Sequence, residues 1–87
     1  HYVLHVKVFI FMSTLKFKIT GCNDHLMWYS KRIGMLAPFV KVYHDCFMSR
    51  EPAGYLNIIR HEDAEIVEVD ENDNILRTID FESKTTI

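Results

Sequence analysis

The residues whose chemistry could support a metal site are two cysteines and two histidines in two short motifs, Cys22-x₂-His25 and His44-x-Cys46. Thiolate and imidazole groups are the ligands that tetrahedral Zn²⁺ prefers in proteins. In a strand, His44 and Cys46 share one face because side chains alternate, so both could bind the same ion. The His-x-Cys spacing is unusual for zinc, however. We favour the simpler interpretation, in which the histidines are polar strand-end residues and the thiols are small buried groups, with no metal.

A thiol nucleophile would use the same residues, since it requires a thiolate, a base and a third group that orients the base. Asp24 and Asp45 stand beside His25 and His44 and could orient them. Such residues are common on protein surfaces, and the sequence contains no glycine-rich phosphate loop, HExxH motif or GxSxG motif. We therefore expect a protein that is not an enzyme and that needs no cofactor.

Charge is distributed unevenly along the chain, although the net charge is only −2. Residues 1–44 carry six basic residues against one acidic residue, whereas residues 45–87 have a net charge of −7. Small barrels can bind nucleic acid through a basic face with interleaved aromatic rings. The residues of this alternative site are Lys16, Lys18, Lys31, Arg32 and Lys41. Lysines on strand exteriors also serve solubility alone, so nucleic-acid binding is the alternative function rather than the first.

Aromatic residues and an acidic run predict a surface for a protein partner. Trp28 and Tyr29 are adjacent, and in a strand adjacent side chains point to opposite faces. We therefore expect Trp28 to be partly exposed and Tyr29 to be packed. The acidic run over residues 62–73 could face a basic partner surface, although such runs are often only solvated. The predicted partner-binding residues are Trp28, Tyr43, Tyr55, Glu68 and Asp70.

About five short strands must position these residues. Leu15, Phe17 and Ile19 alternate with polar residues, which predicts a strand over 15–20 with one buried face. The further predicted elements are strands over 38–45, 55–60, 65–70 and 75–81, a 3₁₀ turn over 61–64, and turns over 49–54 and 71–74. The residues expected to point into one closed core are Phe17, Val40, Val42, Ile58 and Val67.

The length of 87 residues predicts one domain, with segments of different character at its two ends. Residues 1–12 are mostly apolar, and they are either an added strand or a segment upstream of a true start at Met12. We favour the true start at Met12, because an alternating strand begins just after it. The predicted domain is 13–82, followed by a tail over 83–87. No apolar run approaches the roughly 20 residues of a membrane span, so we expect no membrane partner. Two cysteines without a disulfide framework are typical of the cytoplasm.

The order of these elements resembles that of SH3-like barrels. More narrowly, residues 15–70 resemble small uncharacterised proteins of phages and prophages. The residues that carry this resemblance are Trp28-Tyr29, Ile33-Gly34, Phe39-Val40-Lys41-Val42, Tyr55, Ile58-Ile59 and Glu62-Asp63-Ala64-Glu65-Ile66-Val67. The resemblance implies an all-β, SH3-like barrel of about five antiparallel strands, acting in the host cell as a non-catalytic module that binds a host or phage protein. The Pro-rich ligands of the best-known fold relatives are not implied, because Lys31 and Arg32 replace the acidic cluster of those proteins.

Overall fold

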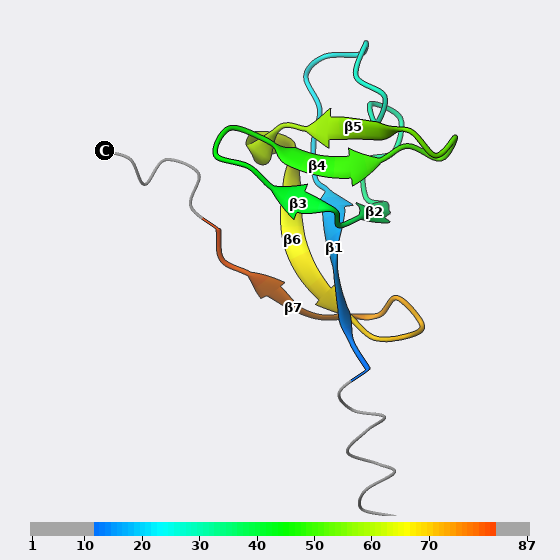
Figure 1. The fold of residues 1–87 in the computed structure, drawn as a ribbon, viewed down its shortest axis with the longest axis vertical. Helices are drawn as coiled ribbons and strands as arrows, with labels where there is room; N and C mark the ends of the chain where they lie inside the picture. The colour runs from blue at the N-terminus through cyan, green and yellow to red at the C-terminus, as the bar shows by residue number, and fades with distance from the viewer. Residues whose placement is uncertain (1–11, 82–87) are drawn as a thin grey trace, which may run out of the picture.

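The computed structural model describes residues 12–81, and these form two antiparallel sheets (Figure 1). One sheet has the strand order β2-β1-β6-β7 and the other has the order β3-β4-β5. The elements are β1 (Thr14–Ile19), β2 (Leu36–Pro38), β3 (Lys41–Val42), β4 (Phe47–Arg50), β5 (Leu56–Ile59), the 3₁₀ turn η1 (His61–Asp63), β6 (Ala64–Val69) and β7 (Ile75–Ile79). The all-β class predicted from the sequence is confirmed, but the two sheets do not close into one barrel.

Strands β1, β5, β6 and β7 lie close to the strands that the sequence predicted. The 3₁₀ turn η1 precedes β6, as expected. The predicted strand over 38–45 is wrong in its extent. The chain forms β2 and β3 instead, and it passes from one sheet to the other at Phe39 and Val40. Pro38 has no N–H to continue the ladder, and its carbonyl oxygen accepts a hydrogen bond from the hydroxyl of Ser49 at 2.7 Å. The strand therefore ends at this proline.

Two predictions fall on residues that the structure does not describe. These are the apolar N-terminal extension, of which only Met12 is described, and the tail over 83–87. Between residues 12 and 81, no helix has the length and apolar character that crossing a bilayer would require.

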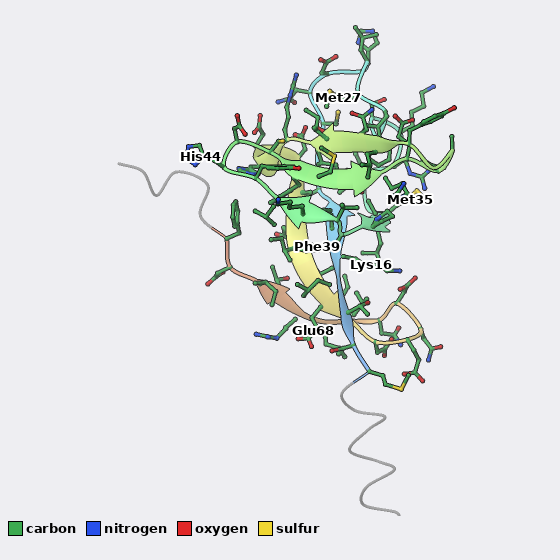
Figure 2. All side chains as sticks on the ribbon, viewed as in Figure 1. Lys16, Met27, Met35, Phe39, His44 and Glu68 are labelled. Atoms are coloured by element: carbon green, nitrogen blue, oxygen red, sulfur yellow. The ribbon has the colours of Figure 1, made fainter. Side chains whose placement is uncertain are left out.

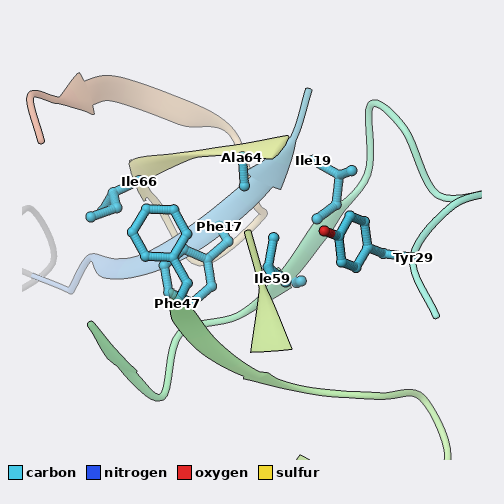
Figure 3. Close-up of a cluster of buried hydrophobic side chains, with 8 residues drawn as sticks. Phe17, Ile19, Tyr29, Phe47, Ile59, Ala64 and Ile66 are labelled. Atoms are coloured by element: carbon cyan, nitrogen blue, oxygen red, sulfur yellow. The ribbon is translucent and has the colours of Figure 1, made fainter. Parts of the chain in front are cut away.

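The hydrophobic core lies between the two sheets (Figure 3). In the first sheet Phe17 is opposite both Ala37 and Ile66, and in the second Phe47 is opposite Ile59. The rings of Phe17 and Phe47 stack across the gap with their centroids 4.6 Å apart. The buried cluster consists of Phe17, Ile19, Tyr29, Ala37, Phe47, Ile59, Ala64 and Ile66. Each large ring removes about 150–250 Å² from water, so this stack is a main anchor of so small a core.

The prediction that Val40 and Ile58 belong to the core is wrong. Val40 is 41% exposed and Ile58 is 37% exposed. Val40 lies between β2 and β3, where the alternation of a single strand is broken. In β5 it is Ile59 that faces the core beside Phe47, and this leaves Ile58 on the outer face of the sheet.

Val67 is buried, as expected, but it does not join the core cluster. It is opposite Lys16 in the β1–β6 register, whereas Ile66 is opposite Phe17. A shift of one residue along a strand reverses the face, so Val67 lies on the other side of the sheet. Phe17 is fully buried as predicted, and Val42 packs against the cluster while partly exposed.

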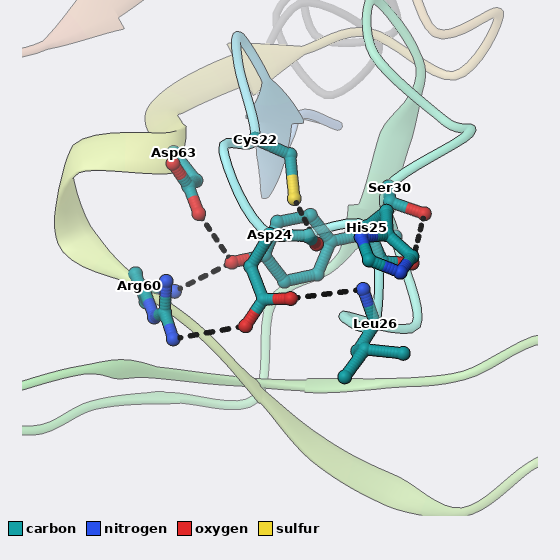
Figure 4. Close-up of polar contacts among 8 residues, drawn as sticks. Cys22, Asp24, His25, Leu26, Ser30, Arg60 and Asp63 are labelled. Atoms are coloured by element: carbon teal, nitrogen blue, oxygen red, sulfur yellow. Dashed lines mark hydrogen bonds and ion pairs between the residues drawn. The ribbon is translucent and has the colours of Figure 1, made fainter.

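The loop over residues 20–35, which we call the β1–β2 loop, covers an edge of the second sheet. Within the described residues, β5 has a strand neighbour on one side only. On the other side, the indole Nε1 of Trp28 donates to the carbonyl oxygen of Ile58 at 2.8 Å. The hydroxyl of Tyr29 accepts the backbone N–H of Arg60 at 3.2 Å and donates to Asp63 Oδ2 at 2.5 Å (Figure 4). Side chains thus occupy an edge at which another chain could otherwise pair. As predicted, Trp28 is partly exposed and Tyr29 is buried.

We expect Tyr29→Phe to lower the free energy of unfolding by about 1–3 kcal/mol, because it leaves two polar groups without their partner in a buried place. The carboxylate of Asp63 loses its donor and the N–H of Arg60 loses its acceptor. Urea unfolding followed by circular dichroism measures the change. Tyr55→Phe is the matched control, since Tyr55 is 71% exposed and should give no change. Equal stability of the two variants would contradict this role for Tyr29.

The same hydroxyl predicts a dependence of stability on alkaline pH. Burial, followed by the hydrogen bond to Asp63, raises the pKa of Tyr29 well above its ordinary value. In the unfolded chain a tyrosine loses its proton near about pH 10, while the folded protein keeps the proton on Tyr29. The contribution of this group is therefore present below about pH 10 and is lost as the pH rises further. Between about pH 10 and 11, the unfolding free energy should fall more steeply in the wild type than in Tyr29→Phe. Equal slopes of the unfolding free energy against pH in the wild type and in Tyr29→Phe would contradict this role of Tyr29.

Candidate functional site

A small pocket lies where the β1–β2 loop, β2 and the β4–β5 hairpin meet. Its volume is about 110 Å³, and we call it the Trp28 pocket. The lining residues are Trp28, Arg32, Leu36, Ala37, Pro38, Arg50 and Pro52. These residues come from two stretches of the sequence, 28–38 and 50–52, so the pocket exists only in the folded chain.

The fold holds each wall of this pocket in place. The indole of Trp28 is fixed by its hydrogen bond to β5, and it meets the ring of Tyr29 edge-on at a centroid distance of 5.5 Å. The β4–β5 hairpin closes with Gly54 at a φ of 104°, a conformation that L-residues with a Cβ rarely adopt. Within that hairpin, Nη1 of Arg50 donates to the carbonyl oxygen of Gly54 at 2.7 Å. The hairpin therefore orients Arg50.

The charge in the Trp28 pocket is positive and locally uncompensated. No acidic residue lines it, whereas two arginines do. The nearest carboxylate in sequence, that of Glu51, accepts a hydrogen bond from Asn57 Nδ2 at 2.6 Å. Within residues 12–81, neither Arg32 nor Arg50 forms an ion pair. An anionic group would therefore be attracted to this pocket.

The pocket unites residues from two different predictions. Trp28 was predicted for a protein partner and Arg32 for nucleic acid, and both line the same cavity. Arg50 was in neither predicted set. The sequence predicted it in a turn over 49–54, which is wrong at the start of that range, because Ser49 and Arg50 belong to β4. Nothing in the local pattern indicates that the β4–β5 hairpin lies against the β1–β2 loop.

None of the other predicted partner residues lines the Trp28 pocket. Tyr55 lies beside the β4–β5 turn, and Tyr43 lies at the β3–β4 turn with the Lys41 ammonium 5.2 Å from its ring centroid. Glu68 is near the opposite end of the molecule from Met27, the neighbour of Trp28 (Figure 2).

Asp70, the last predicted partner residue, stabilises the turn after β6. Its carboxylate accepts the backbone N–H groups of Asn72 and Asn74 at 2.8 and 2.9 Å. The amide of the Asn74 side chain donates to the same carboxylate at 3.1 Å. These three hydrogen bonds give Asp70 a structural role within the turn itself.

The five basic residues predicted for nucleic acid are distributed over both sheets and the β1–β2 loop. Lys16 forms an ion pair with Asp73 at 2.8 Å. Lys18 is opposite Glu65 in the first sheet, whereas Lys41 is in the second. The remaining two, Lys31 and Arg32, are in the β1–β2 loop, and only Arg32 lines the Trp28 pocket. The structure does not gather these five cations into one site.

The cysteine and histidine residues lie in two different loops. Cys22 and His25 are in the β1–β2 loop, where the thiol of Cys22 donates to the carbonyl oxygen of Asp24 at 3.2 Å (Figure 4). His44 and Cys46 are in the β3–β4 turn, and burial, with a smaller effect of Asp45, raises the pKa of the Cys46 thiol. Among the described residues, no three His, Cys, Asp or Glu side chains are grouped as metal ligands would be.

A larger cavity of about 210 Å³ lies between η1, β6 and β7. Its aromatic wall consists of Phe47, His61 and Phe81, with ring centroids 4.5–5.3 Å apart. The rest of the lining is Ala64, Glu65, Ile66, Thr78, Ile79 and Asp80. None of the residues predicted for a site lines this cavity.

Comparison of the chain with protein-family models, with curated proteins and with solved structures finds no match. The candidate site is therefore argued from the geometry of the chain itself. On that geometry the Trp28 pocket is the strongest candidate, since it combines two predicted site residues with an uncompensated charge.

The predicted partner residue Glu68 lies outside the Trp28 pocket, and its hydrogen bonds lead to a prediction about its pKa. Its carboxylate accepts hydrogen bonds from the hydroxyl of Ser13 and from Nε of Arg77, each at 2.6 Å. Ser13 and then Arg77 hold the pKa of Glu68 below its ordinary value. We expect a carbon-13 NMR titration of Glu68 to give a midpoint below about 4.3, the ordinary value for glutamate. The midpoint should rise in Ser13→Ala, and an unchanged midpoint would contradict the bond.

Proposed function

We propose that this chain is a non-catalytic binding module with an SH3-like fold, an accessory protein of a phage or prophage that binds a host or phage protein. The observation that carries this proposal is the Trp28 pocket. It is lined by an indole, two prolines and two arginines that form no ion pair with another residue of 12–81. Tryptophan and arginine are the residue types that most often dominate the energetics of protein interfaces.

The connections between the strands support the SH3-like assignment. The first sheet pairs β1 with β6, and η1 stands between β5 and β6. Strands β2 and β3 follow each other closely and belong to different sheets, as two halves of one bent strand would. The hairpin formed by β6 and β7 is an addition to this plan, and β7 is exposed along most of its length.

The size of the Trp28 pocket favours a side chain of a macromolecule as the ligand. Pockets for whole small molecules usually have volumes of about 300–1,000 Å³, whereas this one has about 110 Å³. A single side chain of an extended protein segment fits so small a volume. The exposed surroundings, including Pro52 and the partly exposed indole of Trp28, leave room for the rest of the segment.

Nucleic acid is the less supported ligand for the same surface. Binding to a phosphate backbone depends on several cations, each of which neutralises one phosphate. Here only Arg32 among the five predicted cations lines the pocket, and Lys16 already has Asp73 as its partner. A protein segment therefore agrees better with the observed charges.

Selection from a library of random twelve-residue peptides by mRNA display against the full chain tests this function. We expect a family of related sequences to be enriched. Their affinity should fall by about tenfold or more in Trp28→Ala, the loss typical of a residue at the centre of an interface. Pro52→Ser should also weaken binding, and because Pro52 is exposed in a turn this variant keeps the fold.

Leu26→Ala is the matched control for the selection. Leu26 is in the β1–β2 loop, 81% exposed and outside the pocket, so peptide affinity should not change. Circular dichroism of each variant separates loss of binding from loss of folding. If no peptide family is enriched, or if binding is indifferent to both pocket variants, the proposed function is wrong.

A further inference from the structure

We propose that Arg32 and Arg50 bind a carboxylate, so that the segment recognised by the Trp28 pocket carries an aspartate or glutamate side chain. This inference rests on the proposed function and specifies its ligand. It starts from how the four arginines of the chain are paired.

Within the part of the chain that the structure describes, two of these arginines have carboxylate partners and two do not. Arg60 pairs with Asp24 at 3.5 Å, and Arg77 pairs with Glu68 at 2.6 Å. Among the described residues, the other two form no ion pair. Both of them line one pocket of about 110 Å³ that contains no acidic residue. The carboxylates of Asp24 and Glu68 thus pair with Arg60 and Arg77. Arg32 and Arg50 are left available for a ligand.

The backbone on which each unpaired arginine stands is held in place before any ligand binds. The N–H of Arg32 donates to the carbonyl oxygen of Tyr29 at 2.9 Å, and its own carbonyl oxygen accepts the N–H of Met35 at 2.9 Å. Arg50 is the last residue of β4, opposite Leu56 in β5. Groups that are already ordered lose less entropy on binding. The backbone at both arginines is therefore ordered in the free protein, and Nη1 of Arg50 is also held by the carbonyl oxygen of Gly54.

A carboxylate is the anion that suits two guanidinium groups in so small a space. The planar fork of N–H groups in arginine matches the two oxygens of a carboxylate, and the resulting charge-assisted hydrogen bonds are short and strong. One N–H of Arg50 is already used by the carbonyl oxygen of Gly54, which leaves further N–H groups for a ligand. The apolar side chains of Leu36, Ala37 and Pro38 line the same pocket and can pack against the methylene groups of an acidic side chain.

A polyanion such as nucleic acid suits this site less well. Only two cations converge, and residues 45–87 have a net charge of −7. Such a field repels an extended chain of phosphates more than it repels one acidic side chain. We therefore commit to an aspartate or glutamate side chain within a protein segment, and nucleic acid becomes an outcome of the test.

The experiment uses a peptide enriched by the selection described above, synthesised with an amidated C-terminus. A second peptide has each acidic residue replaced by its amide. Isothermal titration calorimetry measures the Kd of both peptides with the full chain. We expect the acidic peptide to bind at least about tenfold more tightly, as charged hydrogen bonds of this kind predict.

The contribution of each arginine is measured with Arg32→Gln and Arg50→Gln. Each variant should weaken the binding of the acidic peptide by about tenfold. The Kd of the amide peptide should change by less than about threefold, because the amide has no charge with which the arginine can interact. Lys31→Gln is the matched control, because it removes a positive charge next to Arg32 but outside the pocket. It should change the Kd by less than about twofold.

Four outcomes would overturn the inference. Enriched peptides without acidic residues, or equal affinities of the acidic and amide peptides, would contradict the carboxylate but leave the proposed function intact. Selection of no peptide at all would contradict both. Binding of a single-stranded twelve-nucleotide oligonucleotide that is tighter than that of the peptide and is lost in Arg32→Gln would identify nucleic acid as the ligand.

Discussion

The buried hydroxyl of Tyr29 connects the parts of this chain on which the candidate site depends. It donates to Asp63 in η1 and accepts the N–H of Arg60 at the end of β5. The carbonyl oxygen of Asp63 in turn accepts the N–H of Thr20 at 2.8 Å, where β1 enters the β1–β2 loop. One side chain therefore joins the loop, the 3₁₀ turn and the second sheet. In a domain this small, which buries only about 60% of its unfolded surface, few contacts can share that role.

The Trp28 pocket is a consequence of this connection. Because Tyr29 is held in the core, its neighbour Trp28 is directed to the surface and donates to the exposed edge of β5. The sheet edge is then closed by an indole rather than by a strand, which prevents pairing with another chain. The same indole forms a wall beside Arg32 and Arg50. Protection of the sheet edge and construction of the pocket are thus two effects of one tryptophan.

Sequence reasoning succeeded where structure is local and failed where it depends on contacts between distant segments. The alternation around Phe17 and the order of β5, η1, β6 and β7 depend on near neighbours, and the structure confirms them. The single strand over 38–45 failed because its first residue, Pro38, pairs with β1 in one sheet, whereas Lys41 and Val42 pair with β4 in the other. Val67 is buried as predicted, but it lies on the other face from Phe17, because the register with β1 decides between adjacent positions. Arg50 was missed as a site residue for the same reason, since only the folded hairpin brings it to Arg32.

The unpaired arginines also bear on the stability of the domain. Two like charges at one pocket repel each other, and in the unfolded chain they are far apart, so the empty pocket opposes folding to a small extent. A carboxylate that binds only the folded chain removes this repulsion, and at a concentration of about 100 times its Kd it stabilises the protein by about 2.7 kcal/mol. That amount is a large fraction of the 5–15 kcal/mol by which domains are usually stable. A ligand bound at the Trp28 pocket as proposed would therefore be coupled to folding. The loop that carries both Trp28 and Arg32 is held by Tyr29.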